Sequence, residues 1–105
     1  MTESEIQRDI TAFLKTCGFI VYRMNSGAVR HNVKMCDPGT PDIFVISPYG
    51  KSIWIEVKTE TGKVSFVQQA MHAKLRSYDQ AVIVARSVED VKEIIIWNEE
   101  KVIAT

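Results

Sequence analysis

Three charged side chains interrupt two apolar stretches of the chain. Asp42 comes directly before the apolar run 43–46, and Glu56 and Lys58 lie within a second run over 53–58. Charged side chains inside apolar strands cost free energy unless they are paired or bound to a metal ion. These three residues are therefore the first candidates for chemistry.

The two stretches are joined by residues 47–51, whose composition is typical of a tight turn. Pro48 presets its own φ, and Gly50 can adopt the left-handed conformation. Together they predict a β-hairpin with strands over 42–47 and 52–58.

The register of this hairpin decides whether the charged side chains meet. Pairing of Ser47 with Lys51 would place Asp42 opposite Glu56, because the two strands run antiparallel. Their Cβ atoms would then be about 5 Å apart, and Lys58 would point to the same face because side chains alternate along a strand. A shift by one residue would send Asp42 to the other face. Two opposed carboxylates repel each other, and a divalent cation that prefers oxygen ligands would remove the repulsion.

Each of the three residues also has an interpretation without function. Asp42, which follows Pro41, could be an ordinary turn residue. Glu56 and Lys58 could form a surface ion pair worth at most about 1 kcal/mol. The three residues together, with the two carboxylates opposed, favour a catalytic metal site.

Four short motifs follow one another in order. They are Gly39-Thr40-Pro41-Asp42, Glu56-Val57-Lys58-Thr59, Gly62-Lys63-Val64-Ser65 and Gln68. An Asp followed on the next strand by Glu-x-Lys resembles the PD-(D/E)xK nuclease superfamily. The full set resembles its VRR-NUC (virus-type replication and repair nuclease) family, above all the small stand-alone phage members.

This resemblance implies a Mg²⁺-dependent endodeoxyribonuclease, with Mn²⁺ as a substitute ion. The expected substrate is branched DNA, such as a four-way junction, flap or fork, in phage DNA replication, repair or recombination. The implied catalytic residues are Asp42, Glu56, Lys58 and Gln68. The metal ligands would be Asp42, Glu56 and the backbone carbonyl of Val57. Lys58 would orient or deprotonate the attacking water, or stabilise the transition state, and the family pattern does not decide between these roles.

Two further residues keep two interpretations. Glu5 fits a capping box with Thr2, but it also matches a helix-one Glu that often joins the metal site in this family. Gln68 fits a capping box with Ser65 and also matches an active-site position of the family.

Two other functions also stay open. One is a restriction-type or other repair endonuclease, and the other is a catalytically silent nucleic-acid-binding module of the same fold.

Periodicity and capping residues predict the remaining elements. They are a helix over 3–17, a strand over 19–23, a polar connection over 25–40, the hairpin, a helix over 66–78, a strand over 81–85 and a helix starting at 88, which Ser87 and Asp90 can cap. The order α-β-β-β-α-β-α predicts an α/β fold, a mixed β-sheet flanked by helices, in a single domain over 1–105. The resemblance implies a restriction-endonuclease-like core.

The second long helix and the strand after it carry apolar residues that suggest how they pack. The apolar stripe of the helix consists of Val67, Met71, Leu75 and Tyr78, while Gln68, His72 and Arg76 lie along another face. His72 is expected to be a surface residue. The continuous apolar run 81–85 predicts a central strand, and Trp54 is expected to pack rather than to stack on a base.

Composition places the chain among soluble globular proteins, with 46% hydrophobic and 25% charged residues in a total of 105. No apolar run reaches the roughly 18 residues of a membrane span, and the acidic N-terminus lacks the apolar region of a signal peptide. We therefore expect a cytoplasmic protein of a bacterial or phage-infected cell with no membrane partner. Cys17 and Cys36 are expected to be free thiols.

The net charge is zero, but the charges are unevenly distributed. Residues 1–78 contain ten Lys or Arg and seven Asp or Glu, whereas residues 79–105 contain three and six. Phosphate contacts need local rather than global positive charge. The candidate DNA contacts are Lys63, Arg23, Asn25, Arg30 and Lys34, with His31 in the same connection as the last three.

A homodimer is expected from the resemblance. The apolar segments 94–97 and 102–103 exceed what one helix stripe needs, so a second copy could cover them. Burial of the same residues at the end of a strand or helix is the alternative.

Overall fold

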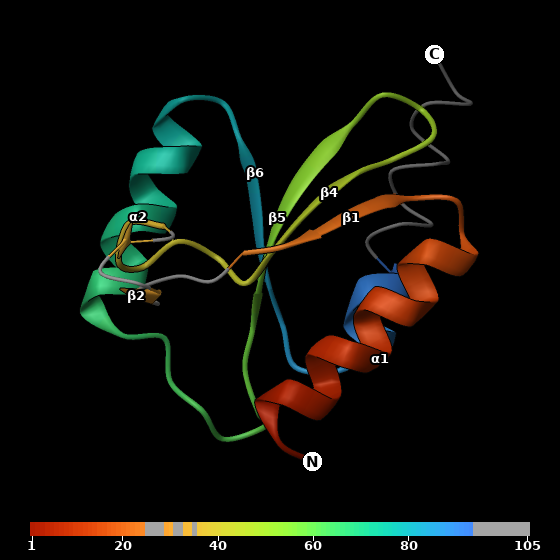
Figure 1. Ribbon diagram of the computed structural model, residues 1–105, viewed down its shortest axis with the longest axis horizontal. Helices are drawn as coiled ribbons and strands as arrows, with labels where there is room; N and C mark the ends of the chain where they lie inside the picture. Colours follow the sequence, from red (N-terminus) through yellow and green to blue (C-terminus); the bar gives the residue numbers. More distant parts are fainter. Residues whose placement is uncertain (25–28, 31–32, 35, 94–105) are drawn as a thin grey trace.

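The computed structural model describes residues 1–24, 29–30, 33–34 and 36–93. A four-stranded sheet has helices on both of its faces (Figure 1). The elements are α1 Glu3–Thr16, β1 Ile20–Arg23, β2 Val29–Arg30, β3 Val33–Lys34, β4 Ile43–Ile46, β5 Ser52–Val57, α2 Phe66–Ser77 and β6 Ala81–Ala85, followed by a helical segment over 88–93. The predicted mixed sheet flanked by helices is confirmed. The short pair β2–β3, which lies in the predicted polar connection, was not expected.

The main sheet has the strand order β1-β4-β5-β6. The pairs β1–β4 and β4–β5 are antiparallel, and β5–β6 is parallel. In the hairpin, Ile43 pairs with Ile55, and the Ser47 N–H donates to the Lys51 carbonyl at 2.7 Å. The predicted hairpin register is therefore confirmed.

Alternation along β4 and β5 separates the two faces of the sheet. The core on the α1 face is formed by Ile6, Ile10 and Leu14 of α1, Ile43 and Val45 of β4, and Ile53, Ile55 and Val57 of β5, with Phe19, Ala85 and Val91 around them. Because neighbouring side chains on a strand point in opposite directions, Glu56 is turned to the other face, which α2 covers.

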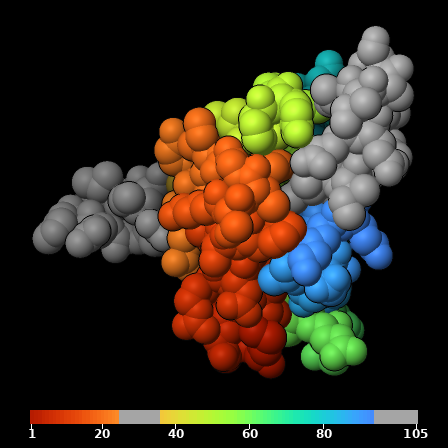
Figure 2. All heavy atoms as spheres, turned by 90° about the vertical axis from the view of Figure 1, so that its right-hand side faces the viewer, coloured from red at the N-terminus to blue at the C-terminus, as the bar shows by residue number. Residues whose placement is uncertain are grey.

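The segment 88–93 lies beside α1 on the core face, as Figure 2 shows with α1 in red and orange and the segment in blue. Val91 is fully packed into the core, and the Lys92 ammonium lies 5.3 Å from the centre of the Phe13 ring. The predicted start is confirmed, because the Asp90 N–H donates to the Ser87 hydroxyl at 3.4 Å. The end of this helix and the apolar segments 94–97 and 102–103 lie outside the described residues.

The surface position expected for His72 is wrong, and the apolar stripe of α2 is only partly buried, with Met71 and Leu75 half-buried. Val67 and Tyr78 of the apolar stripe are 55% and 66% exposed, whereas His72 is 3% exposed. His72 turns inward because it finds a hydrogen-bond partner there, whereas Arg76 stays exposed and reaches the sheet with its guanidinium group. His72 meets Glu56, and Arg76 donates from Nη2 to the Val82 carbonyl at 3.0 Å.

The central position predicted for the strand 81–85 is also wrong for the described sheet, where β6 comes last in the strand order. The apolar run of β6 reflects packing against both faces of the strand. It does not require hydrogen-bonded neighbour strands on both edges. Ala85 packs into the core, while α2 contacts β6 from the other side. None of the described helices is long and apolar enough to cross a membrane.

Candidate active site

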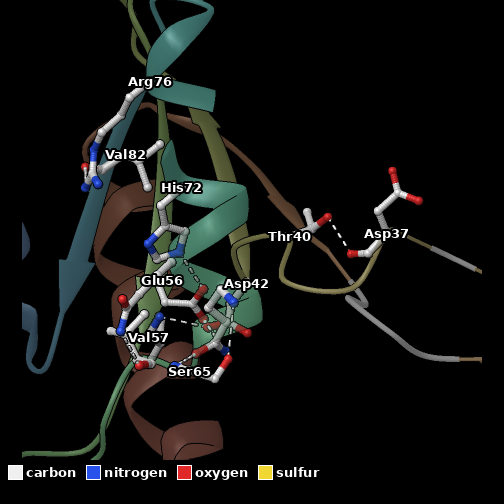
Figure 3. A network of polar contacts seen from close by, with 12 residues as sticks. Asp37, Thr40, Asp42, Glu56, Val57, Ser65, His72, Arg76 and Val82 are labelled. Atoms are coloured by element: carbon white, nitrogen blue, oxygen red, sulfur yellow. Dashed lines mark hydrogen bonds and ion pairs between the residues drawn. The ribbon is translucent and has the colours of Figure 1, made fainter. Parts of the chain in front are cut away.

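Asp42 is held at the point where β4 and β5 diverge. Its Oδ2 accepts a hydrogen bond of 2.8 Å from the Val57 N–H, and its backbone carbonyl accepts one of 2.7 Å from the Met24 N–H (Figure 3). These two bonds fix both the side chain and the backbone. The carboxylate therefore lies beside the end of β5, next to Glu56.

Glu56 is a buried acid, with 1% of its side chain exposed. Burial, together with the hydrogen bond and the negative charge of Asp42, raises the pKa of Glu56 to about 9, although the charge of Lys58 acts in the opposite direction. At pH 7 the metal-free protein therefore carries a protonated Glu56. A carboxyl group of this kind ionises readily only when a cation compensates its charge.

The Val57 carbonyl points toward these two acids. The Lys58 N–H donates to the Ala85 carbonyl of β6 at 3.0 Å. Because the C=O and N–H of one trans peptide point in opposite directions, the Val57 carbonyl faces the Asp42 side. No group of three or more His, Cys, Asp or Glu side chains in the described part of the chain could hold a metal ion. Two carboxylates and a carbonyl, completed by water, nevertheless fit Mg²⁺, which binds through one or two carboxylates and keeps several waters.

Lys58 lies on the same face as Glu56 and is 8% exposed. Its position two residues along the strand places the ammonium group near the carboxylates, which is why its charge lowers the pKa of Glu56. The backbone at Gly62 packs over this side chain, since a Cβ built there would lie 3.6 Å from the Lys58 Cδ. The site thus combines a buried cation with two acids.

The Gln68 side chain makes two contacts, one within the cap of α2 and one with Glu56. Its Oε1 accepts from the Ser65 N–H at 2.9 Å and completes the predicted capping box of α2. The cap turns the amide nitrogen toward Glu56, and Nε2 donates to Oε2 at 3.4 Å. The capping role therefore sets the direction of the donor.

The structure places Glu5 in the predicted capping box. The Thr2 N–H donates to the Glu5 carboxylate at 3.0 Å, and this hydrogen bond lowers the pKa of Glu5. The negative charge of Glu3, in the first turn of α1, adds a smaller contribution to the raised pKa of Glu56. The sequence analysis did not single out Glu3.

The loop that carries Asp42 approaches α2 very closely. Gly39 has a φ of +87°, and a Cβ built on it would lie 2.4 Å from the Val67 carbonyl oxygen. The Thr40 hydroxyl donates to the Asp37 carbonyl at 2.7 Å and closes the turn. Only glycine fits this position, which explains the first residue of the Gly-Thr-Pro-Asp motif.

The residues predicted to contact DNA are only partly brought together. Arg23 donates to the Gln7 side chain through Nε at 2.9 Å and also through Nη2, and Lys63 is exposed beside the start of α2. Asn25 and His31 lie outside the described residues. Arg30 and Lys34 lie in β2 and β3, without a described side chain.

Arg86 is a structural residue of the site that the sequence analysis missed. Its Nη1 donates to the carbonyls of Thr59 at 2.7 Å, Glu60 at 3.3 Å and Gly62 at 2.6 Å. These bonds hold the turn that follows Lys58. An arginine directly after a buried strand was the available signal, but nothing local connects it to a turn 24 residues away.

Trp54 packs as predicted. Its ring centre lies 4.5 Å from that of Phe44, and its indole N–H donates to the Gln80 side chain at 3.2 Å. Both contacts hold it within the α2 side of the sheet.

Comparisons with known proteins place this geometry in a family context. A family model for the VRR-NUC domain matches residues 25–89, a range that includes Asp42, Glu56, Lys58 and Gln68 but excludes Glu5 and Arg23. A solved structure described as a VRR-NUC domain is similar, with a TM-score of 0.69 and 25% sequence identity over 90% of this chain and 96% of the other. No curated protein matches the chain.

Proposed function

The chain belongs to the VRR-NUC family, whose members are nucleases of the PD-(D/E)xK superfamily, and we propose that it is a Mg²⁺-dependent endonuclease that hydrolyses phosphodiester bonds in DNA. One observation carries the proposal above the others. Glu56, with a pKa of about 9, is buried against Asp42, so the pair needs a cation before both carboxylates can be ionised.

Asp42, Glu56 and the carbonyl of Val57 would hold the divalent cation. When bound, such a cation lowers the pKa of a coordinated water and offsets the negative charge that develops on the phosphate. Asp42 is held in place by the Val57 N–H, so its carboxylate does not have to reorganise on binding. The rigid end of β5 thus presents the acids at a fixed separation.

Lys58 acts on the phosphate rather than on the metal, because an ammonium group has no free lone pair. Buried beside the carboxylates, it stabilises the negative charge that builds up on the scissile phosphate, or it orients the attacking water. Gln68 orients Glu56 from the opposite side through its amide nitrogen.

We further propose that the substrate is branched DNA and that the enzyme acts as a homodimer in the cytoplasm of a bacterial or phage-infected cell. Support for a branched substrate comes from the resemblance of the Gly-Thr-Pro-Asp and Glu-Val-Lys motifs to those of the small phage members of the family. A C₂ dimer would present two identical sites to a four-way junction with near two-fold symmetry.

Cleavage assays test the proposal directly. Purified protein should cut labelled flap, fork or four-way DNA with Mg²⁺, and added chelator should stop the reaction. The Asp42→Asn variant should keep its fold, since the amide oxygen still accepts from Val57, but should not cut. Undiminished cutting by this variant would overturn the assignment.

For the dimer, light scattering should give twice the monomer mass of 11.9 kDa. A monomer mass both free and bound to DNA would exclude a dimer.

A further inference from the structure

His72 has no role in the function proposed so far, yet it is one of the most deeply buried polar residues. Its side chain is 3% exposed, and its Nε2 lies 2.9 Å from the Glu56 Oε1 (Figure 3). A buried imidazole of this kind must be held by a specific partner. Its partner is the acid proposed to bind the metal.

Both oxygens of Glu56 meet a nitrogen from a side chain of α2. His72 approaches Oε1, and Gln68, one turn earlier on the same helix face, approaches Oε2 at 3.4 Å. Asp42, which directly precedes β4, forms a hydrogen bond with the same carboxyl. The carboxylate is therefore clamped on the helix side, and its remaining lone pairs are directed to the side of Asp42.

We propose that His72 is a positioning residue, which donates its Nε2–H to the Glu56 Oε1 and thereby fixes the ionised carboxylate in the orientation that binds the divalent cation. The donor has to be neutral for this purpose. A Lys or Arg at this position would compensate the charge of Glu56 and compete with the metal ion, whereas an imidazole offers a hydrogen bond without that charge.

The other polar side chain of this helix face leaves Glu56 to His72 and Gln68. Arg76, one turn further along α2, is itself directed to the Val82 carbonyl and does not compete for Glu56.

The inference rests on the proposed metal-dependent nuclease, so its test measures metal binding without DNA. Two variants whose side chains at position 72 are equally long distinguish loss of the hydrogen-bond donor from loss of packing. His72→Gln keeps an N–H at the same distance from the backbone, and His72→Met removes it. Partners that orient a metal ligand are typically worth 10- to 100-fold in affinity. We therefore expect calorimetry to show Mn²⁺ binding weakened about 10- to 100-fold in His72→Met and within about threefold of wild type in His72→Gln.

Arg76→Met is the matched control. It removes a polar side chain from the same helix face, but its hydrogen bond goes to a backbone carbonyl of β6. Mn²⁺ affinity should remain at the wild-type value. At saturating metal, His72→Met should regain most of its turnover rate, because the defect is in binding rather than in the chemical step.

A spectroscopic readout of the wild type does not depend on any variant folding. In the Mg²⁺-loaded protein, the ¹⁵N spectrum of the His72 imidazole should show a protonated Nε2, with the signal assigned by its absence in His72→Gln. An unprotonated Nε2 would overturn the inference. Equal Mn²⁺ affinity of His72→Met and the wild type would also overturn it. If the wild type itself binds no metal and cuts no DNA, the proposed function fails instead.

Discussion

Replacing Glu56 with Gln should stabilise the metal-free protein, although it should abolish nuclease activity. The pKa of Glu56 rises from an ordinary value of 4.5 to about 9 in the folded protein. Between these values the side chain is ionised in the unfolded chain and protonated in the folded one, so folding takes up a proton. The stabilising effect of this proton is complete below pH 4.5 and is lost as the pH rises toward 9.

The magnitude follows from the same shift. One pKa unit corresponds to about 1.4 kcal/mol, so the interval from 4.5 to pH 7 costs the wild type about 3 kcal/mol of unfolding free energy. The amide of the Glu56→Gln variant avoids this cost, because it needs no proton to be neutral. It also keeps two of the polar contacts, since its oxygen can accept from His72 and its nitrogen can donate to Asp42 as the protonated acid does, and it loses only the long 3.4 Å hydrogen bond from Gln68.

Urea denaturation followed by far-UV circular dichroism, with chelator present, measures the difference at several pH values. Relative to Glu56→Gln, the wild type should lose about 1.4 kcal/mol per pH unit between pH 5 and 9. Glu60→Gln, which removes the same charge from an exposed turn, should differ from the wild type by no more than about 0.5 kcal/mol.

Two outcomes would refute this reasoning. The first is a Glu56→Gln variant that is less stable than the wild type at every pH. The second is a stability difference that does not change with pH.

Saturating Mg²⁺ should also raise the unfolding free energy of the wild type but not that of Glu56→Gln, because only an ionised carboxylate binds the cation.

Three more predictions concern the residues around the acids. Lys58→Met should lower the turnover rate by roughly 10²–10³-fold while Mn²⁺ binding survives, and a turnover rate equal to wild type would exclude the proposed role of the ammonium group. Arg86→Met should lower the unfolding free energy by about 2–3 kcal/mol, because three carbonyls lose a charged donor; an unchanged denaturation midpoint would contradict this. Gly39→Ala should cost at least about 1–2 kcal/mol for its positive φ alone, and steady-state kinetics should show reduced cleavage, because the added Cβ pushes the loop of Asp42 away from the Val67 carbonyl.

The parts of the site that were predictable depend on short-range rules. The turn between Ser47 and Lys51 fixes the hairpin register, and that register alone brings Asp42 to Glu56. The capping boxes of α1 and α2 are equally local, because each involves residues three positions apart. Such features follow from the residues themselves and do not require knowledge of the rest of the fold.

The long-range parts were not predictable in the same way. Nothing near Arg86 in the sequence indicates that it will hold the carbonyls of residues 59–62. The position of β6 at the end of the described sheet depends on its parallel pairing with β5, a long-range contact that the local sequence does not indicate. An apolar run reports burial of the two faces of a strand, but it carries no information on the two edges.

The unexpected burial of His72 on α2 is a consequence of the site itself. Periodicity assigns the apolar side of a helix to the interior, and that rule assumes that the surface it covers is apolar. The face of the sheet turned to α2 carries Glu56, a buried acid with two oxygens that need donors. The helix therefore turns Gln68 and His72, four positions apart, toward the sheet, where they reach both oxygens. A polar stripe at helical spacing, read together with charged residues in the strand that it covers, thus indicates which face of such a helix is buried.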